Sequence, residues 1–207
     1  AVASAITMTL GNLLALQQDD VKRLLAYSTI SHVGFILMAF AIISPDAVRA
    51  IMLYLFIYLF MNLAAFYMAI FASNKLNAHH IKDWDGLSRK NPILCAFMAL
   101  TLISLTGLPP TAGFVGKFYI FAELFKHQQF YWLAVVAILN SVVSLFYYFK
   151  IVKSMYLTDP DAADNKIDAH PVVNWSIILL SSQNLLFFIY WEPLIGFIEK
   201  SINLWKG

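Results

Sequence analysis

Residues Ser104 to Phe125 read SLTGLPPTAGFVGKFYIFAELF, an apolar segment with one lysine, Lys117, near its middle. A charged side chain at the centre of a bilayer costs roughly 2.5 to 3.5 kcal/mol on insertion scales. Such residues therefore usually face the interior of a helix bundle or a water-filled cavity, where they mark routes for ions or protons. Lys117 is for this reason the first candidate functional residue.

The same segment predicts a broken helix. A continuous helix from Pro92 to Phe125 would be about 51 Å long, whereas the hydrocarbon core of a bilayer is about 30 Å thick. Proline removes a backbone donor and clashes with the preceding turn, so we expect the break where Gly107, Pro109, Pro110 and Gly113 lie together. Unwound backbone at membrane depth is buried in protein or lines a cavity, and the ends of half-helices build ion sites in transporters.

Composition places the chain in a membrane. Of its 207 residues, 60% are hydrophobic and 13% are charged, and the mean hydropathy is +0.70. A water-soluble domain of average composition does not show these values. With about 20 apolar residues per crossing, the sequence predicts an all-α, polytopic transmembrane helix bundle with six crossings in a single membrane domain, 1–207. The expected helices are 1–16, 24–43, 47–72, 92–125 with a break near 107–113, 130–157 and 172–198.

The first residues read AVASAITMTLGNLLAL and have neither an initiator Met nor a basic region before the apolar run. They therefore resemble neither a signal peptide nor a natural amino terminus. We interpret them as the interior of a helix, and expect residues 1–207 to be the carboxy-terminal part of a longer chain.

Cationic residues are distributed unevenly over the predicted loops. Alternating crossings place nine of the 14 Lys and Arg residues on one side and four on the other, and leave Lys117 within a span. The positive-inside rule then puts the richer side in the cytoplasm or the mitochondrial matrix, and the carboxy terminus on the opposite side. The nine are Lys22, Arg23, Lys75, Lys82, Arg89, Lys90, Lys150, Lys153 and Lys166, and the four are Arg49, Lys126, Lys200 and Lys206.

Several classes of site are not expected. A net charge of +2, without a basic patch, argues against nucleic-acid binding. The single cysteine, Cys95, excludes an internal disulfide and a CxxC metal site, and we interpret it as a small buried residue. The sequence has no Walker loop and no GxGxxG motif. We therefore expect neither a cofactor nor a metal ion to bind to this chain.

Polar residues at helical spacing form stripes on three predicted helices. Such stripes either join helices by hydrogen bonds or line a route for protons. Histidine titrates near neutrality, so both a relay role and a core role stay open for His32. The three stripes are Ser28, Ser31 and His32; Tyr54, Tyr58 and Asn62; and Asn140, Ser144 and Tyr147.

Lys117 has two interpretations. Its long stem could carry the amine to an interface, but a reach of about 6 Å is short of a loop about 13 Å away along the helix. A lysine held away from water can instead load and release a proton when neighbouring charges change. Glu123, between Lys117 and that loop, is either an interfacial acid or a step in proton exit. His79 and His80 are expected to be solvated loop residues.

Two longer stretches resemble a known family. They are QQDDVKRLLAYSTISHVGF, Gln17 to Phe35, and SLTGLPPTAGFVGKFYIF, Ser104 to Phe121. Both are similar to the antiporter-like membrane subunits of respiratory complex I, a family shared with Mrp-type sodium/proton antiporters. GKFY at 116–119 and YLFMNLAAF at 58–66 favour one branch of this family, because sister branches tend to place a His or Lys in the second stretch.

The resemblance implies a protein of fourteen helices with two inverted five-helix repeats, in which this chain supplies the second repeat and the last helix. Lys117 would be the lysine of the broken twelfth helix, and His32 the histidine of the tenth. Lys22 and Arg23 match the basic pair that opens the tenth helix, as cytoplasmic anchors or relay residues. Lys117, His32, Glu123 and Lys22 are thus the predicted proton relay.

The function implied is that of a proton-translocating subunit of NADH:quinone oxidoreductase, whose FMN, iron–sulfur clusters and quinone belong to other subunits. Its partners would be the other membrane-arm subunits and the lipid bilayer, and its location the bacterial inner membrane rather than the mitochondrial one. Acidic and basic relay residues of the first repeat would lie outside this sequence, so the chain alone is not expected to pump. An Mrp-type cation/proton antiporter, a membrane-hydrogenase subunit and a structural spacer remain alternatives.

Overall fold

The computed structural model describes residues 1–159 and 171–206, so Lys166 lies outside the described residues. Within them the chain is almost entirely helical, and the β contact is one isolated bridge between Asp20 and His80. The helices are α1 (Val2–Leu16), α2 (Val21–Phe40), α3 (Pro45–Leu76), η1 (Ile81–Trp84), α4 (Leu87–Lys90), α5 (Pro92–Thr106), α6 (Ala112–Leu124), η2 (Gln128–Phe130), α7 (Tyr131–Leu157), α8 (Pro171–Ile189) and α9 (Trp191–Lys206).

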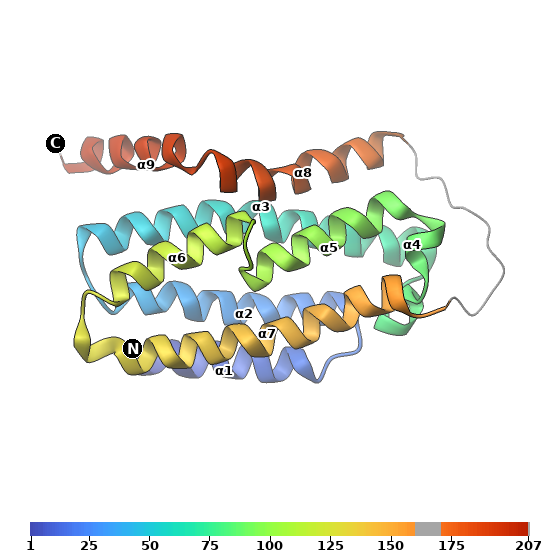
Figure 1. The fold of residues 1–207 in the computed structure, drawn as a ribbon, viewed down its shortest axis with the longest axis horizontal. Coiled ribbons are helices and arrows are strands. Elements are labelled where there is room, and N and C mark those ends of the chain that lie inside the picture. The colour runs from blue at the N-terminus through green and yellow to red at the C-terminus, as the bar shows by residue number, and fades with distance from the viewer. Residues whose placement is uncertain (160–170, 207) are drawn as a thin grey trace.

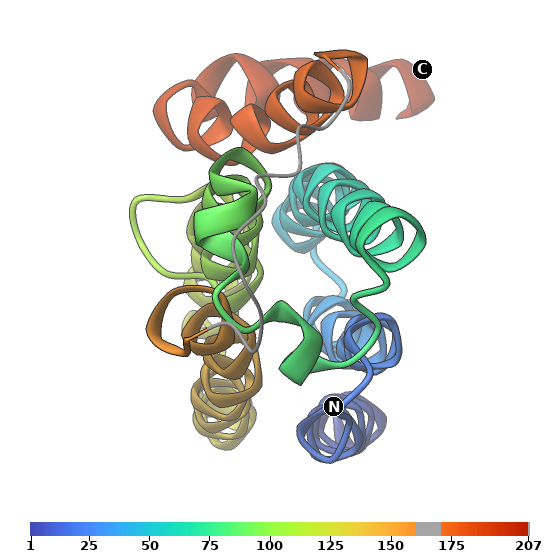
Figure 2. The same cartoon turned by 90° about the vertical axis from the view of Figure 1, so that its right-hand side faces the viewer.

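The long helices run along one axis of the molecule, and successive crossings alternate in direction (Figure 1). Helix α6 follows α5 along one crossing, and α9 follows α8 along another. Seen end-on, α8 and α9 form a layer over α3 and the α5–α6 crossing, with α1 on the far side (Figure 2). Four stretches are long and apolar enough to span a membrane: Val21–Phe40, Pro45–Leu76, Gln128–Leu157 and Pro171–Ile189. The expected all-α membrane bundle with a broken crossing is confirmed.

Caps fix where the helices begin. Asp20 accepts a hydrogen bond from the Arg23 amide at 2.9 Å and starts α2 three residues before the expected position. Ser44 caps α3 in the same way through the Ala47 amide, and the chain leaves α3 through Asn77 in the left-handed conformation. Helix α3 thus reaches Leu76, beyond the expected end at residue 72. Apolar length alone underestimates such helices, because their polar ends continue past the hydrocarbon.

The break between α5 and α6 covers residues 107–111. Gly107 has a φ of +86°, and its amide donates to the carbonyls of Ile103 and Ser104, which ends α5. Gly113 was expected in the break but lies inside α6, where its amide donates to Ser104 Oγ at 3.1 Å. A Cβ atom at Gly113 would collide with the Ser104 carbonyl group. Gly113 therefore serves the close approach of the two half-helices rather than the unwinding.

The last crossing differs from the prediction of one helix over 172–198. Helix α8 ends at Ile189 and α9 begins at Trp191, with Tyr190 between them. A proline ring clashes with the carbonyl group of the residue four positions earlier, and for Pro193 that residue is Ile189. The proline was present in the sequence, but its effect on this helix was not anticipated. The result is a second interrupted crossing.

The apolar core lies in two clusters. The larger joins α2, α3, α5 and α7, includes Trp84 of η1, and extends to α8 and α9. The smaller joins α1, α2, α3, α6 and α7 around Phe35 and Tyr54. Helices α1 and α2 approach each other at Gly11 and Gly34, where an added Cβ would meet backbone atoms of Ser31 and Met8. Small residues at such contacts are typical of membrane helices.

Candidate functional site

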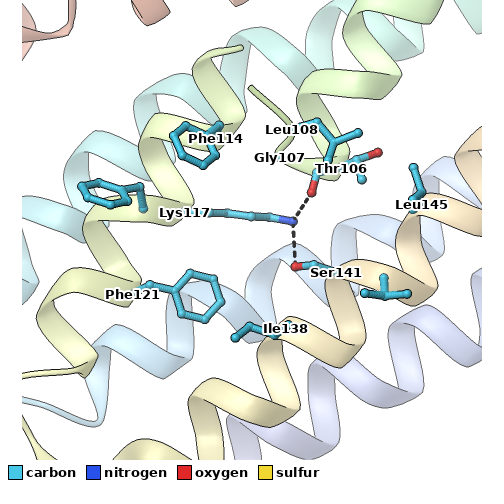
Figure 3. Close-up of a pocket in the computed structure, with 11 residues that line it drawn as sticks. Thr106, Gly107, Leu108, Phe114, Lys117, Phe121, Ile138, Ser141 and Leu145 are labelled. Carbon is cyan, nitrogen blue, oxygen red and sulfur yellow. Dashed lines mark hydrogen bonds between the residues drawn. The ribbon is translucent and has the colours of Figure 1, made fainter. Parts of the chain in front are cut away.

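Lys117 is buried, with 5% of its surface exposed, and lies on the inner side of α6. Its Nζ donates to the Thr106 carbonyl oxygen at 2.8 Å and to Ser141 Oγ at 3.3 Å. Figure 3 shows the side chain reaching from α6 to the point where α5 ends and α7 passes. Nζ also lies 4.5 Å from the centre of the Phe35 ring on α2. Side chains and backbone from four helices therefore meet at this amine.

The position of Thr106 explains why an oxygen acceptor is available to the amine. Thr106 is the last residue of α5, and the last four carbonyl groups of a helix lack intrahelical partners. The carbonyl end of a helix also carries a partial negative charge, so that a cation near it is favourable. The interrupted helix therefore provides an oxygen acceptor at this depth, and Lys117 binds it instead of extending toward the interface.

A cavity of about 260 Å³ lies beside the amine. Phe114, Phe118 and Phe121 of α6 form one wall, and residues of α7 that include Ile138 and Ser141 form the other (Figure 3). These walls are largely apolar. Water occupies about 30 Å³ per molecule, so the cavity is large enough for several, and Lys117 and Ser141 supply polar groups to its lining.

His32 is the centre of a second cluster, formed by α2, α3 and α7. Its Nδ1 lies 2.6 Å from the Tyr54 hydroxyl, its Nε2 lies 3.4 Å from the Tyr148 hydroxyl, and its ring centre is 4.8 Å from that of Tyr58. His32 itself is 3% exposed. The imidazole is therefore hydrogen-bonded between two tyrosines. This arrangement is compatible both with a core residue whose hydrogen bonds are satisfied and with a proton carrier. Phe35, in contact with Lys117, lies one turn further along α2.

The other predicted lining residues separate into two groups. Ser28 bonds to the Leu25 carbonyl of its own helix, and Ser31 is buried where α2 meets α1. Asn62 is half-buried on α3. Ser28 and Ser31 thus bond within α2 or lie at its contact with α1, and the hydrogen bonds of Lys117 go to other residues.

Asn140 joins α7 to α1. Its side chain accepts from Asn12 Nδ2 at 2.8 Å and donates to Thr9 Oγ1 at 3.1 Å, and Tyr147 donates to Asn12 Oδ1 at 2.9 Å. Ser144 bonds to the Ser141 carbonyl of its own helix. This stripe therefore acts as a clamp between helices, one of the two roles that the sequence left open.

Glu123 is buried at the far end of α6, with 6% of its surface exposed. It accepts a hydrogen bond from Ser44 Oγ at 3.0 Å and pairs with Lys126 Nζ at 2.6 Å. Lys126 follows α6 and is itself exposed. Its hydrogen bond with the Glu123 carboxylate raises the pKa of Lys126 above the ordinary value. Glu123 is therefore an acid tied to two neighbours rather than a freely solvated one.

Lys22 lies at the opposite end of the bundle, in the first turn of α2. Its Nζ donates to the buried Ser73 Oγ at 2.9 Å, and the same hydroxyl lies 2.8 Å from His79 Nδ1. His79 is exposed, as expected, but it is also connected to Ser73. These three residues connect α2, α3 and the loop that follows α3. The structure thus leaves Lys22 well apart from the Lys117 group.

Comparison with known proteins gives the family. Residues 1–144 match the family described as NADH:quinone oxidoreductase/Mrp antiporter, TM. The chain belongs to this family. The sequence of this chain is 39% identical to that of NADH-quinone oxidoreductase subunit N from Anaeromyxobacter sp. (strain Fw109-5), over 100% of this chain and 41% of that protein. It therefore spans about two fifths of the length of this curated relative. This relative belongs to the branch of the family that the stretches GKFY and YLFMNLAAF favoured.

Solved structures show the same antiporter-like fold. A chain of respiratory complex I from Thermus thermophilus with bound aureothin is similar at a TM-score of 0.78 and 27% identity, over 94% of this chain and 44% of that one. A chain of the Mrp complex from Dietzia sp. DQ12-45-1b is similar at a TM-score of 0.82 and 21% identity, over 95% of this chain and 45% of that one. At that identity the second likeness concerns the fold alone.

The sequence did not reveal several residues that surround Lys117 and His32. Ser141 is adjacent to the predicted Asn140, but it lies on the side of α7 that faces α6 and not α1. Thr106 contributes only a backbone oxygen, which no side-chain pattern reveals. Phe35 and Tyr148 belong to ordinary apolar runs. A helical-wheel search around each predicted polar residue would have found Ser141, whereas the contact to Thr106 requires the location of the break.

Proposed function

We propose that the chain is part of a proton-translocating membrane subunit of NADH:quinone oxidoreductase, of the subunit N type. The observation that supports this most is the buried amine of Lys117, held by the terminal carbonyl of a half-helix and by Ser141 beside a cavity. Ionisable residues within membrane spans mark ion and proton routes, and broken helices supply ion sites at their ends. Lys117 is the residue at which both features coincide.

In this proposal, Lys117 carries the proton and the surrounding groups control its charge state. The Thr106 carbonyl and the α5 dipole stabilise the ammonium form. A new charge about 4 Å away would change the energy of that form by about 4 kcal/mol at an effective dielectric constant of about 20. Moving one charge through 100 mV costs about 2.3 kcal/mol. One change of charge in a neighbouring group is thus enough to load or discharge the lysine.

The other relay candidates lie on both sides of Lys117. His32 precedes Phe35 by one turn of α2, and Phe35 contacts the amine. Glu123 follows Lys117 by six residues, which is about 9 Å along α6. We propose that protons pass from the His32 cluster to Lys117 and leave past Glu123, with Lys22 either anchoring α2 at the cytoplasmic face or acting at the uptake end.

The redox chemistry would belong to other subunits. We propose that FMN, iron–sulfur clusters and quinone are bound there, and that this chain receives the free energy of electron transfer through contacts with other membrane-arm subunits. The residues present agree with this division, because an iron–sulfur cluster requires several thiolates and the chain has one cysteine, which is buried. A bacterial inner membrane is the proposed location, and the relative from Anaeromyxobacter supports it.

The test replaces Lys117 with methionine in the full-length subunit within the assembled complex. The expected result is normal assembly with strongly reduced proton translocation per quinone reduced, because methionine is unbranched and nearly as long as lysine but cannot carry a proton. Lys75→Met is the matched control, since Lys75 is exposed at the end of α3. Normal translocation by an assembled Lys117→Met complex would contradict the proposal and support the structural spacer.

The Mrp-type antiporter and the membrane-hydrogenase subunit remain alternatives within the family. Likeness to the Mrp complex concerns the fold, whereas the relative with 39% identity is a subunit N. Sodium-dependent proton exchange in vesicles that contain the full-length subunit without an NADH dehydrogenase would favour the antiporter.

A further inference from the structure

A group of charged residues surrounds Glu123 at the end of the bundle. Asp46 and Arg49 lie in the first turns of α3, Lys126 follows α6, and Glu199 lies on α9. Arg49 Nη1 is 3.0 Å from Asp46 Oδ1 and 3.4 Å from Glu199 Oε1. Lys126 Nζ is 2.6 Å from Glu123 Oε2 and 3.5 Å from Asp46 Oδ2. The ion pairs therefore form one chain from Glu123 to α9.

A cavity of about 310 Å³ lies inside this group. Helix α3 lines it with Asp46, Arg49 and Ala50, and α6 lines it with Glu123. Because liquid water occupies about 30 Å³ per molecule, the cavity has room for several. The buried carboxylate of Glu123 thus borders a space lined by both charged and apolar side chains at this end of the bundle.

Helix α9 forms the remaining wall through Ile195, Ile198 and Glu199. Ile198 is 5% exposed and packs into the larger apolar cluster, and the next residue, Glu199, pairs with Arg49. Since α9 is separated from α8 at Tyr190, it can change its contact with α3 without displacing α8. The position of α9 therefore decides how open the cavity is.

The contact between Arg49 and α9 is a weak one. One nitrogen of Arg49, Nη1, is shared between two carboxylates, whereas the strongest arginine pairs are bidentate. Arg49 Nε is buried and has no hydrogen-bond partner among the described residues. The side chains of Arg49 and Glu199 are 42% and 43% exposed, and such pairs contribute about 0 to 1 kcal/mol. A tether of this strength can open and close.

We infer that the Arg49–Glu199 pair holds α9 over the cavity and so limits the access of water to the Glu123 carboxylate. The inference rests on the proposed function in one respect, namely that Glu123 releases protons toward this end. Arg49 and Glu199 are positioning residues, because they act on Glu123 through α9 and through water. Breaking the pair would expose the cavity, while leaving Lys117 and its partners in place.

The experiment measures access to the cavity directly. Ala50→Cys provides a reporter thiol, because Ala50 lines the cavity and is 2% exposed, and Cys95 is buried. In the purified assembled complex, the rate of labelling by a water-soluble methanethiosulfonate is compared with and without Glu199→Gln. We expect Glu199→Gln to increase the rate several-fold, and Arg49→Gln to do the same. Glu199→Asp, which keeps the charge, should restore a slow rate.

Lys200→Gln is the matched control, since Lys200 is the exposed neighbour of Glu199 on α9. Quinone reductase activity reports assembly of each variant. A rate that Glu199→Gln leaves unchanged, or that Lys200→Gln raises equally, would overturn the tether. Labelling does not depend on pumping, so this result is independent of the Lys117→Met test. If labelling rises while Lys117→Met pumps normally, the tether stands and the proposed proton route fails.

Discussion

Lys117 is bound by a backbone oxygen on one side and a hydroxyl group on the other. Its contact with Thr106 depends on where α5 ends, whereas its contact with Ser141 depends on one side chain of α7. These two contacts can be separated experimentally, because substitution removes only the second. The role of Ser141 can therefore be tested while the broken helix stays intact.

Ser141→Ala should reduce proton translocation without abolishing it. Hydrogen bonds to charged groups contribute about 1.5 to 3 kcal/mol, and a bond of 3.3 Å should fall below that range. A loss of about 1 kcal/mol corresponds to roughly a fivefold change in an equilibrium constant. The measurement is protons translocated per quinone reduced. Ser144→Ala is the control, because its hydroxyl bonds within α7, and an equal loss in both variants would remove Ser141 from the site.

At the level of single residues, the sequence predicted which side chains are unusual but not what they contact. Lys117 and Glu123 were recognisable because charges within apolar runs are rare. His32 was recognisable from its place in a polar stripe. Their partners were not, because Tyr148, Phe35 and Ser44 are ordinary residues that become neighbours only when helices distant in sequence pack together.

At the level of elements, the two interrupted crossings have different causes. Gly107 ends α5 in a left-handed conformation, and adjacent prolines follow it. In the last crossing Pro193 is the cause, and Tyr190 separates two helices that continue along the same face (Figure 1). The first break was predictable because length, glycine and proline agreed. The second was not, because 172–198 has an acceptable length for one tilted crossing.

Gly113→Ala tests the contact between the half-helices. An added Cβ would collide with the Ser104 carbonyl group, and overpacking of this kind typically costs about 1 to 3 kcal/mol. We expect a lower unfolding temperature of the purified protein. Gly196→Ala is the matched control, since nothing lies within 4 Å of an added Cβ there and alanine favours a helix by about 0.5 to 1 kcal/mol over glycine. Equal stability of the two variants would contradict the close packing at Gly113.

At the level of the whole molecule, the two ends differ in their charged groups. One end carries the loop after α3, with Lys22, Ser73 and His79 joined by hydrogen bonds. The other carries the ion pairs around Glu123. Alternation of the crossings was predictable from apolar length, and it placed these groups at opposite ends. The pairs at each end were not, because most of them join residues of different elements that come together only when the helices pack.

Sidedness can be measured with one cysteine at each end. Lys75→Cys and Lys200→Cys both replace exposed side chains, and the positive-inside rule places Lys75 in the cytoplasm. In oriented vesicles, an impermeant thiol reagent should label Lys75→Cys only from the cytoplasmic face and Lys200→Cys only from the opposite one. Labelling of both cysteines from the same face would contradict the alternation of the crossings. Labelling of each from the face opposite to the expected one would show that the chain has the reverse orientation.

The Thr106 carbonyl gives Lys117 a partner that does not titrate. A carboxylate partner could take up a proton and leave the lysine uncompensated, but a peptide oxygen keeps the same dipole at every physiological pH. Within this contact, only the amine can gain or lose a proton. Nor can any substitution of the Thr106 side chain remove the oxygen that binds the amine. Only a shift in the end of α5 can do so. To change this contact, evolution or design would therefore have to move the helix break.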